Sequence, residues 1–554
     1  MNDTDTDRMT RAYNALPAAL KQMGYTELRD AQKPCIDSIF QGKNVFCILP
    51  TGGGKTAIMA LPTVAFKCQT LVLSPLIALM KDQVDSLNRK HVRAAAINSV
   101  QTEMENWKAV EEWASGELSV LYVAPERMAN DQLQLALKQN APELVVVDEC
   151  HCMSQWSSSF RPAYASCGAI ISELKPRQII AMTATATTEI IEDVKRILGL
   201  SDIHIEQHYE ARHNLQLSCE FVDDTALHYN VLKWVRKIEG SIIVYCNTVS
   251  LVNELVEYLK QAGEDVVWYH GQMTNMTLRE YNQDQFMSGQ VRVMVATNAF
   301  GMGIDKPDIR GIIHANVPSS VEAIAQEVGR ASRDGEPAIC HMLASPHGFH
   351  MQEYFWNNSN PETFVISRVF NYLKRVCDKD NIVTETIASI EQSTQCETAA
   401  AAVNYLTSLG VISRHKPEAK VATVTIQTKD PSALTKARRK VYDAIITNGI
   451  YHGDSAAKNP VYKIDLKFLA SVVGSSEASV KSHINQMKKD EYIAYEAPFS
   501  GKVTKIEREL TKADLDAAQA RRDLEWAKVA AARVYCTTPD DEKHEYMTRY
   551  FLKA

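Results

Sequence analysis

A glycine-rich loop between an apolar strand and a helix most constrains the fold of this chain. Val45 to Leu49 has the composition of a buried strand, and the stretch from Ala57 to Ala60 favours a helix. Glycines between them let backbone N–H groups approach a phosphate, and the new helix adds its positive end. The lysine can reach the β- and γ-phosphates, and the threonine after it can hold Mg²⁺. We therefore expect a nucleoside triphosphate, contacted by Thr51, Gly52, Gly53, Gly54, Lys55 and Thr56.

An acidic pair, Asp148 and Glu149, follows the apolar run Leu144 to Val147. Asp148 can bind Mg²⁺ and Glu149 can orient the attacking water for phosphoryl transfer. Acids that merely end a strand are the plain alternative. The spacing of 93 positions from Lys55 to Asp148 instead suits the several strand–helix units of a RecA-like domain.

The composition is that of an ordinary globular protein. The chain has 554 residues, 45% of them hydrophobic and 23% charged, enough for about three or four domains. No apolar run approaches the ~20 residues of a membrane span, and the polar start does not resemble a signal peptide. We expect an intracellular, cytoplasmic protein without membrane contact, associated with the nucleoid if the source is bacterial.

The cysteines favour buried reduced thiols over metal ligands. The 12 cysteines form no C-x-x-C pair, and the spacing of Cys150 and Cys152 around His151 does not suit zinc.

The net charge of −7 is unevenly spread, because residues 429–506 carry 13 Lys and Arg against 8 Asp and Glu. A local basic face matters more for nucleic acid than the total charge.

Two series of short apolar runs alternate with helical stretches, which predicts an α/β fold with two parallel sheets. The first series is 45–49, 70–73, 120–123, 144–147 and 179–182, and the second is 241–245, 266–269, 291–296, 311–314 and 338–343. We predict two tandem RecA-like domains over residues 1–205 and 206–345. Two winged-helix-type α+β domains are expected to follow over 346–428 and 429–506, and a helical hairpin over 507–554.

Over roughly residues 15–345 the motifs resemble a RecQ-type DNA helicase of superfamily 2, a DExH motor. The segment from Tyr25 to Gln32 is similar to the family motif in which the glutamine reads the adenine edge. The resemblance implies ATP as cofactor, with Mg²⁺, and places Tyr25, Arg29 and Gln32 around the base.

Three further segments imply DNA contacts through the same resemblance. Ser74 and Lys81 lie in a stretch similar to the motif that touches the DNA backbone. Thr183 begins a motif that couples hydrolysis to the grip on the strand, and Thr297 and Asp305 belong to a later motif. The resemblance implies DNA contact by the two threonines and nucleotide contact by Asp305.

The segment from His151 to Pro162 looks like the aromatic-rich loop that sets RecQ enzymes apart from other motors of this class. An exposed Trp or Phe offers a base-stacking face of about 1–3 kcal/mol, and an arginine adds charge. Simple core packing of the two aromatic residues is the alternative. We predict DNA contact by Gln155, Trp156, Phe160 and Arg161.

The segment from Gln326 to Gly335 matches the family motif that carries arginine fingers. Arginines three residues apart share one face of a helix and can neutralise charge on a transferring phosphoryl group. Surface salt bridging is the alternative. We predict catalytic roles for Gln326, Arg330 and Arg333, beside those of Lys55, Asp148 and Glu149.

RecQ enzymes usually carry a four-cysteine zinc module after this motif, but residues 346–554 contain only Cys377, Cys396 and Cys536, so we predict no zinc. The residues 520–552 faintly resemble the helical hairpin of that module.

Two helix–turn–helix patterns, 383–412 and 466–493, predict winged helices. The first is expected to be closed by a strand at 421–426 and the second by a wing at 495–506. The expected DNA contacts of the second winged helix are Lys481, Lys488 and Lys489.

These features predict an ATP-dependent DNA helicase, moving 3′ to 5′ on single strands and acting on forked duplexes in repair or recombination. We expect a monomer. Two alternatives stay open: an RNA helicase or a DNA remodeller that does not unwind, and a DNA-binding scaffold that has lost catalysis. The aromatic-rich loop disfavours RNA, and the complete set of catalytic residues disfavours the scaffold.

Overall fold

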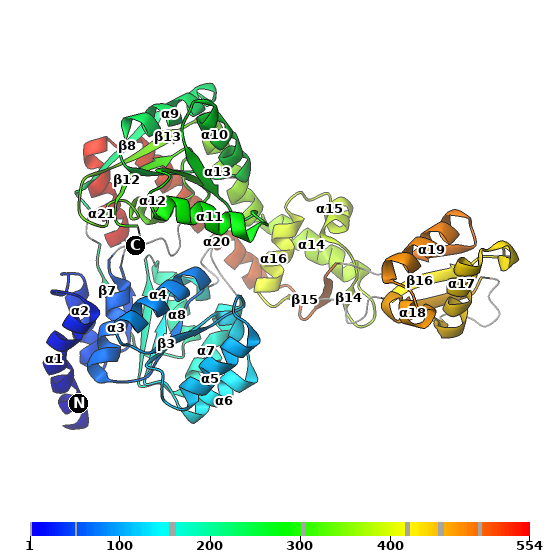
Figure 1. Ribbon diagram of the computed structural model, residues 1–554, viewed down its shortest axis with the longest axis horizontal. Helices are drawn as coiled ribbons and strands as arrows, with labels where there is room; N and C mark the ends of the chain where they lie inside the picture. Colours follow the sequence, from blue (N-terminus) through cyan, green and yellow to red (C-terminus); the bar gives the residue numbers. More distant parts are fainter. Residues whose placement is uncertain are drawn as a thin grey trace. The chain divides into compact units, whose positions relative to one another are not determined.

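The computed structural model describes residues 3–49, 53–154, 162–184, 186–209, 211–300, 306–415, 421–451, 459–496 and 501–553. The chain forms two compact units, Met1–Trp356 with Asp523–Ala554, and Asn357–Arg522. The first contains two parallel sheets and the second contains two smaller antiparallel sheets (Figure 1). This arrangement confirms the predicted α/β class with tandem RecA-like domains.

The first sheet has seven parallel strands in the order β3-β4-β2-β5-β6-β1-β7. Its strands are β1 (Val45–Ile48), β2 (Thr70–Leu73), β3 (Ala94–Ile97), β4 (Val120–Val123), β5 (Leu144–Val147), β6 (Gln178–Thr183) and β7 (His204–Gln207). The helices are α1 (Asp3–Met23), α2 (Gln32–Phe40), α3 (Lys55–Phe66), α4 (Ile77–Arg89), α5 (Glu103–Ala114), α6 (Asp131–Gln139), α7 (Pro162–Leu174) and α8 (Thr188–Ile197), with turns η1 (Pro125–Arg127) and η2 (Cys150–Met153). Successive residues Phe46 and Cys47 enter different apolar clusters, so the sheet is buried on both faces.

The second sheet has six parallel strands in the order β10-β11-β9-β12-β13-β8. Its strands are β8 (Leu215–Phe221), β9 (Ser241–Tyr245), β10 (Val266–Tyr269), β11 (Val293–Ala296), β12 (Ile309–His314) and β13 (Ala338–Ala344). Its helices are α9 (Leu227–Lys237), α10 (Val249–Gln261), α11 (Met276–Met287), α12 (Val321–Val328) and α13 (Pro346–Ser359), with the turn η3 (Asp224–Ala226).

The last helices pack against the second sheet. They are α20 (Lys512–Thr537), the turn η5 (Asp540–Glu542) and α21 (Lys543–Lys553). Tyr535, Met547 and Phe551 join the apolar cluster that contains Leu217 and Met342 of the sheet. The part of this helical segment from Asp523 onward therefore shares its core with the second RecA-like domain.

The second unit consists of two modules, one inserted into the other. The outer module contains α14 (Thr363–Val376), β14 (Ile382–Val383), α15 (Ile387–Thr394), α16 (Ala399–Ser408), β15 (Ile412–His415) and β20 (Val503–Ile506). The inner module contains β16 (Val421–Ile426), η4 (Pro431–Ala433), α17 (Lys436–Asn448), β17 (Ile450–Tyr451), β18 (Val461–Asp465), α18 (Leu466–Val473), α19 (Glu477–Lys489) and β19 (Ile493–Glu496). β15 pairs antiparallel with β20, so the inner module occupies the tip of that hairpin.

Strand pairing corrects two predictions for this unit. The wing predicted over 495–506 is wrong, because β19 pairs with β16 whereas β20 pairs with β14 and β15. The strand at 421–426, predicted to close the first winged helix, is β16 and lies between β18 and β19. Strands β19 and β20 are therefore neighbours in the sequence but belong to different sheets.

Candidate active site

The order of strands in the first sheet brings the predicted nucleotide-binding residues together. β6 lies between β1 and β5, so the carboxyl ends of these three strands are neighbours. Lys55 follows the loop after β1, and Glu149 follows β5. The Nζ atom of Lys55 lies 2.9 Å from Oε1 of Glu149, and both side chains are mostly buried. The lysine predicted to bind phosphate and the carboxylate predicted to be catalytic thus share one site.

Gly54, directly before Lys55, has a backbone conformation that favours glycine. Gly54 has φ +80° and caps the start of α3, a conformation that glycine adopts at little cost. The buried amide of Gln32 donates to the Gly54 carbonyl at 3.2 Å and accepts from the Arg29 backbone at 2.9 Å. A Cβ on Gly54 would lie 2.0 Å from that amide nitrogen. Gln32 therefore packs directly on the phosphate loop.

Burial and neighbouring charges set the ionisation of the three central groups. Burial, reinforced by the Glu149 charge, raises the pKa of Asp148 to about 6. Burial also opposes the charge on Glu149, but Lys55 and His151 outweigh it and leave the pKa of that carboxyl below its usual value. The two carboxylates likewise outweigh burial for Lys55, whose pKa is raised. Lys55 and Glu149 thus form a charged pair at neutral pH.

Asp148 is held by hydrogen bonds from both sides. Its Oδ1 accepts from the Glu149 backbone N–H at 3.0 Å, and its Oδ2 accepts from the Ser74 hydroxyl at 3.4 Å. Ser74 is only 1% exposed, so its hydroxyl faces the carboxylate and not the surface where DNA contact was predicted. Lys81, seven residues further along, is exposed.

His151 lies between the acidic pair and the end of β6 and contacts both. Nδ1 of His151 lies 2.8 Å from the Thr183 hydroxyl and 3.4 Å from Oε2 of Glu149. Burial lowers the pKa of His151, which favours the neutral ring. Thr183 is fully buried, so direct DNA contact by its side chain, as predicted, does not fit this position. Its contact with His151 does fit the predicted coupling role.

The arginine segment approaches the same site from the second domain. Arg330 is 7% exposed, and its charge helps to lower the pKa of Glu149. The prediction that Arg330 and Arg333 share a helical face is wrong, because α12 ends at Val328 and Ser332 has φ +46°. The arginines instead lie on an irregular loop, while Gln326 lies on the last turns of α12.

Two residues of the interdomain linker, the segment that joins β7 to β8, hold that loop. Sequence reasoning missed both. Arg212 donates from Nη1 to the Gly329 carbonyl at 3.1 Å and from Nη2 to the Ser332 carbonyl. Asn214 donates to the Ser332 hydroxyl at 3.2 Å. Burial, with the nearby charges of Arg333 and Arg29, lowers the pKa of Arg212. No motif marks such anchors, because their partners are mostly backbone carbonyls.

The remaining predicted contacts have mixed positions. Tyr25 lies under Nζ of Lys90, 5.3 Å from the ring centre, and Thr297 directly follows β11. On α19, Lys481, Lys488 and Lys489 are exposed. Seven predicted site residues lie outside the described part of the chain: Thr51, Gly52, Gln155, Trp156, Phe160, Arg161 and Asp305.

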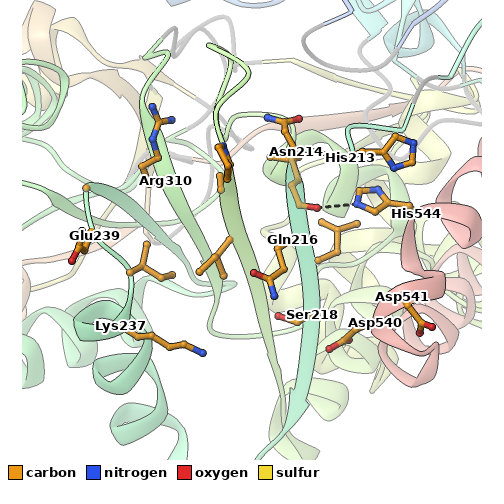
Figure 2. Close-up of a pocket in the computed structure, with 17 residues that line it drawn as sticks. His213, Asn214, Gln216, Ser218, Lys237, Glu239, Arg310, Asp540, Asp541 and His544 are labelled. Carbon is orange, nitrogen blue, oxygen red and sulfur yellow. Dashed lines mark hydrogen bonds between the residues drawn. The ribbon is translucent and has the colours of Figure 1, made fainter.

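A hollow of about 980 Å³ lies elsewhere, at the amino ends of β8 and β13 (Figure 2). Its lining includes Asn214, Arg310 and His544 but none of the predicted catalytic residues.

Within the described ranges, no cluster of three or more His, Cys, Asp or Glu side chains could hold a metal ion. None of the helices described is long and apolar enough to cross a membrane.

The zinc prediction can be tested on purified protein. We expect no stoichiometric zinc, and activity that survives chelation once Mg²⁺ is restored, because the cysteines are scattered and free. Elemental analysis measures the zinc content directly. One tightly bound zinc per chain would refute this interpretation of the cysteines.

Known proteins share these features. Residues 29–194 match the DEAD/DEAH box helicase family and residues 225–335 match the helicase conserved C-terminal domain. The probable ATP-dependent DNA helicase RecS of Bacillus subtilis is 36% identical over 362 residues, 64% of this chain and 72% of RecS. The ATP-dependent DNA helicase RecQ of the same organism is 35% identical over 61% of this chain. A structure of the helicase MrfA bound to DNA and AMPPNP aligns with 82% of this chain and 62% of its own, at a TM-score of 0.50 and 16% identity, which supports the fold alone.

The nucleotide site and the two RecA-like sheets define a helicase-type ATPase. The chain belongs to the RecQ family of ATP-dependent DNA helicases. It spans 72% of the length of RecS but 57% of the length of RecQ.

Proposed function

We propose that this protein hydrolyses ATP to move 3′ to 5′ on single-stranded DNA and to unwind duplexes, including forked ones, during repair or recombination. The observation that carries the proposal is the meeting of Lys55, Glu149 and Arg330, from two RecA-like domains, at one buried site. The protein would act as a monomer inside the cell.

Hydrolysis follows from the positions of these groups. Thr56 and Asp148 offer hard oxygen ligands that suit Mg²⁺, which would shield charge on the phosphates. Glu149 accepts hydrogen bonds from the attacking water, and Lys55 binds the β- and γ-phosphate oxygens. Arg330 and Arg333 stabilise the charge that develops in the transition state. Closure of the cleft between the two RecA-like domains brings these arginines to the nucleotide. Repeated closing and opening moves the protein stepwise along the strand.

The contact between His151 and Thr183 supports coupling between DNA binding and hydrolysis. The aromatic-rich loop begins at His151 and contains Trp156 and Phe160. A base that stacks on this loop can move His151, and with it the partner carboxylate Glu149.

Trp156→Ala tests that coupling. Loss of one stacking contact should cost about 1–3 kcal/mol of binding, so we expect a modest binding defect, normal basal ATPase activity and lost unwinding. Single-strand binding, ATPase and strand-displacement assays on one preparation measure the three quantities. An unfolded variant would support core packing of Trp156, and normal unwinding would exclude the loop as a sensor.

The inner module is better suited to DNA than the outer one. Its helix α19 exposes Lys481, Lys488 and Lys489. The equivalent helix of the outer module, α16, contains no Lys or Arg. Within this unit α16 shares a buried cluster with Ala518 of α20, and Tyr405 donates to the Asp514 carbonyl at 3.4 Å. We therefore assign duplex contact to α19.

Lys481→Gln combined with Lys489→Gln should weaken duplex binding and flatten its salt dependence, because each lysine that neutralises a phosphate releases counterions. Lys436→Gln with Lys467→Gln, on α17 and α18, removes the same charge from other helices of the inner module. Titrations at several salt concentrations measure the slope. Equal effects of the two double variants would refute a specific role for α19.

An RNA helicase and a remodeller without unwinding activity are the competing functions. ATPase rates with single-stranded DNA, single-stranded RNA or no nucleic acid separate them, because a DNA motor is stimulated by DNA. Stronger stimulation by RNA would overturn the proposal, and so would the absence of any stimulation.

A further inference from the structure

Helix α21 contacts both RecA-like domains and the linker between them. The Tyr550 hydroxyl donates to Oε1 of Glu322, in the first turn of α12, at 2.9 Å. The ring of Phe551 stacks on Tyr209 in the linker, with centroids 4.6 Å apart. The carbonyl of Phe551 accepts a hydrogen bond from the side chain of Gln207, the last residue of β7. Two consecutive residues thus join α12, the linker and β7.

These contacts lie in well-packed surroundings. Phe551 is 6% exposed and shares an apolar cluster with Val321, Ile324 and Val328 of α12. Burial and the neighbouring Glu322 carboxylate raise the pKa of Tyr550, so its hydroxyl remains a donor at neutral pH. A half-buried hydrogen bond to a charged group contributes more than one between neutral groups.

The other end of α21 is fixed to the second sheet. His544 donates from Nε2 to the Leu215 carbonyl of the edge strand β8 at 2.8 Å (Figure 2). Oδ1 of Asp540, in the turn just before α21, accepts from the Cys219 backbone at 3.2 Å. α21 is therefore anchored on one domain, and its far end reaches the neighbouring domain.

The position of α12 decides where the catalytic arginine lies. α12 ends at Val328, and Arg330 follows two residues later. A small shift of α12 therefore displaces the guanidinium, and a misplacement of about 1 Å can cost roughly 100-fold in rate.

We propose that α21 is a positioning element of the ATPase site, in which Tyr550 holds α12 through Glu322 while Phe551 holds the linker and β7. The inference rests on the proposed function, because it assigns the element that places Arg330. Tyr550 and Phe551 are positioning residues, since neither contacts the nucleotide-binding groups.

Tyr550→Phe removes only the hydroxyl and tests the proposal against a matched control, Tyr546→Phe. Tyr546 is on the same helix, but its hydroxyl donates to the Ala531 carbonyl of α20 at 2.8 Å. We expect Tyr550→Phe to lower kcat for DNA-stimulated ATP hydrolysis about tenfold with an unchanged KM for ATP, and Tyr546→Phe to leave both near wild type. Glu322→Gln should lower kcat similarly, and the double variant with Tyr550→Phe should be no worse than either single variant.

Hydrogen exchange gives a readout that does not need activity. Amides of α12 should exchange faster in Tyr550→Phe than in wild type or Tyr546→Phe, while those of α10 should not change. Unchanged α12 exchange, or a kcat equal to that of Tyr546→Phe, would overturn the positioning role. A wild-type protein without DNA-stimulated hydrolysis would refute the proposed function instead, and the exchange result would still decide whether Tyr550 orders α12.

Discussion

Lys55→Ala is expected to reduce DNA-stimulated ATP hydrolysis by at least about 100-fold while single-strand binding stays measurable. The variant loses the cation that we propose binds the β- and γ-phosphates, and such electrostatic contacts contribute about 10²–10³ in rate. Glu149→Gln should cause a similar loss, because an amide cannot accept the proton of the attacking water. ATPase rates with and without DNA, beside a binding titration, check this expectation.

The controls for Lys55→Ala must separate catalysis from stability. Removing Lys55 leaves Glu149 buried without its 2.9 Å partner, and breaking a buried pair costs about 3–5 kcal/mol. The double variant Lys55→Ala/Glu149→Gln removes the unpaired charge. It should recover thermal stability without recovering hydrolysis. Full turnover in a folded Lys55→Ala protein would eliminate the motor assignment.

Arg330→Ala should produce the second large effect, a loss of about 10³-fold in kcat with little change in the KM for ATP. Arginine fingers contribute about 10³–10⁵ to phosphoryl transfer, and an interaction made only in the transition state lowers kcat alone. Its low exposure and its effect on the pKa of Glu149 place its charge within reach of the acidic pair. Arg549→Ala, on the exposed side of α21, is the matched control.

Steady-state ATPase kinetics measure this effect. A raised KM with normal kcat would show that Arg330 binds ground-state nucleotide and does not act in the transition state. Normal values of both kcat and KM would show that Arg330 has no role in hydrolysis.

The sheet strands with strong apolar runs were predictable, and the weak ones were not. β1, β2, β4, β5 and β6 appear where Val, Ile and Leu predict them. The sequence of β3 is Ala-Ala-Ala-Ile, and alanine has little strand preference. The edge strands β7 and β8 carry polar residues because one side of each lacks a strand neighbour. Local composition therefore identified the central strands and the apolar edge strand β10, but it missed the edge strands β3, β7 and β8.

Long-range pairing explains the errors in the second unit. β15 and β20 form a hairpin although 87 residues separate His415 from Val503 in the chain numbering. Sequence reasoning joined β19 to β20 because they are close in sequence, which is the usual arrangement of sequential strands. An inserted module breaks that expectation, although the basic composition of residues 429–506 sets this part of the chain apart.

The site was predictable where a motif carries its own chemistry. Lys55, Asp148 and Glu149 meet as the motif spacing predicts. Ser74 and Thr183 were predicted to contact DNA, and the structure places both side chains in buried positions near the acidic segment. Arg212 was missed because its hydrogen bonds go to backbone carbonyls, which leave no signature in sequence.

Strand displacement on tailed duplexes shows whether this protein unwinds DNA and in which direction it moves. Duplexes with a single-stranded 3′ tail or 5′ tail should be incubated with the wild-type protein and ATP, beside Lys55→Ala. We predict rapid separation of the 3′-tailed duplex, little separation of the 5′-tailed duplex and none with Lys55→Ala. Equal separation of both duplexes, a preference for the 5′ tail, or activity that survives in Lys55→Ala would contradict a 3′ to 5′ ATP-driven helicase.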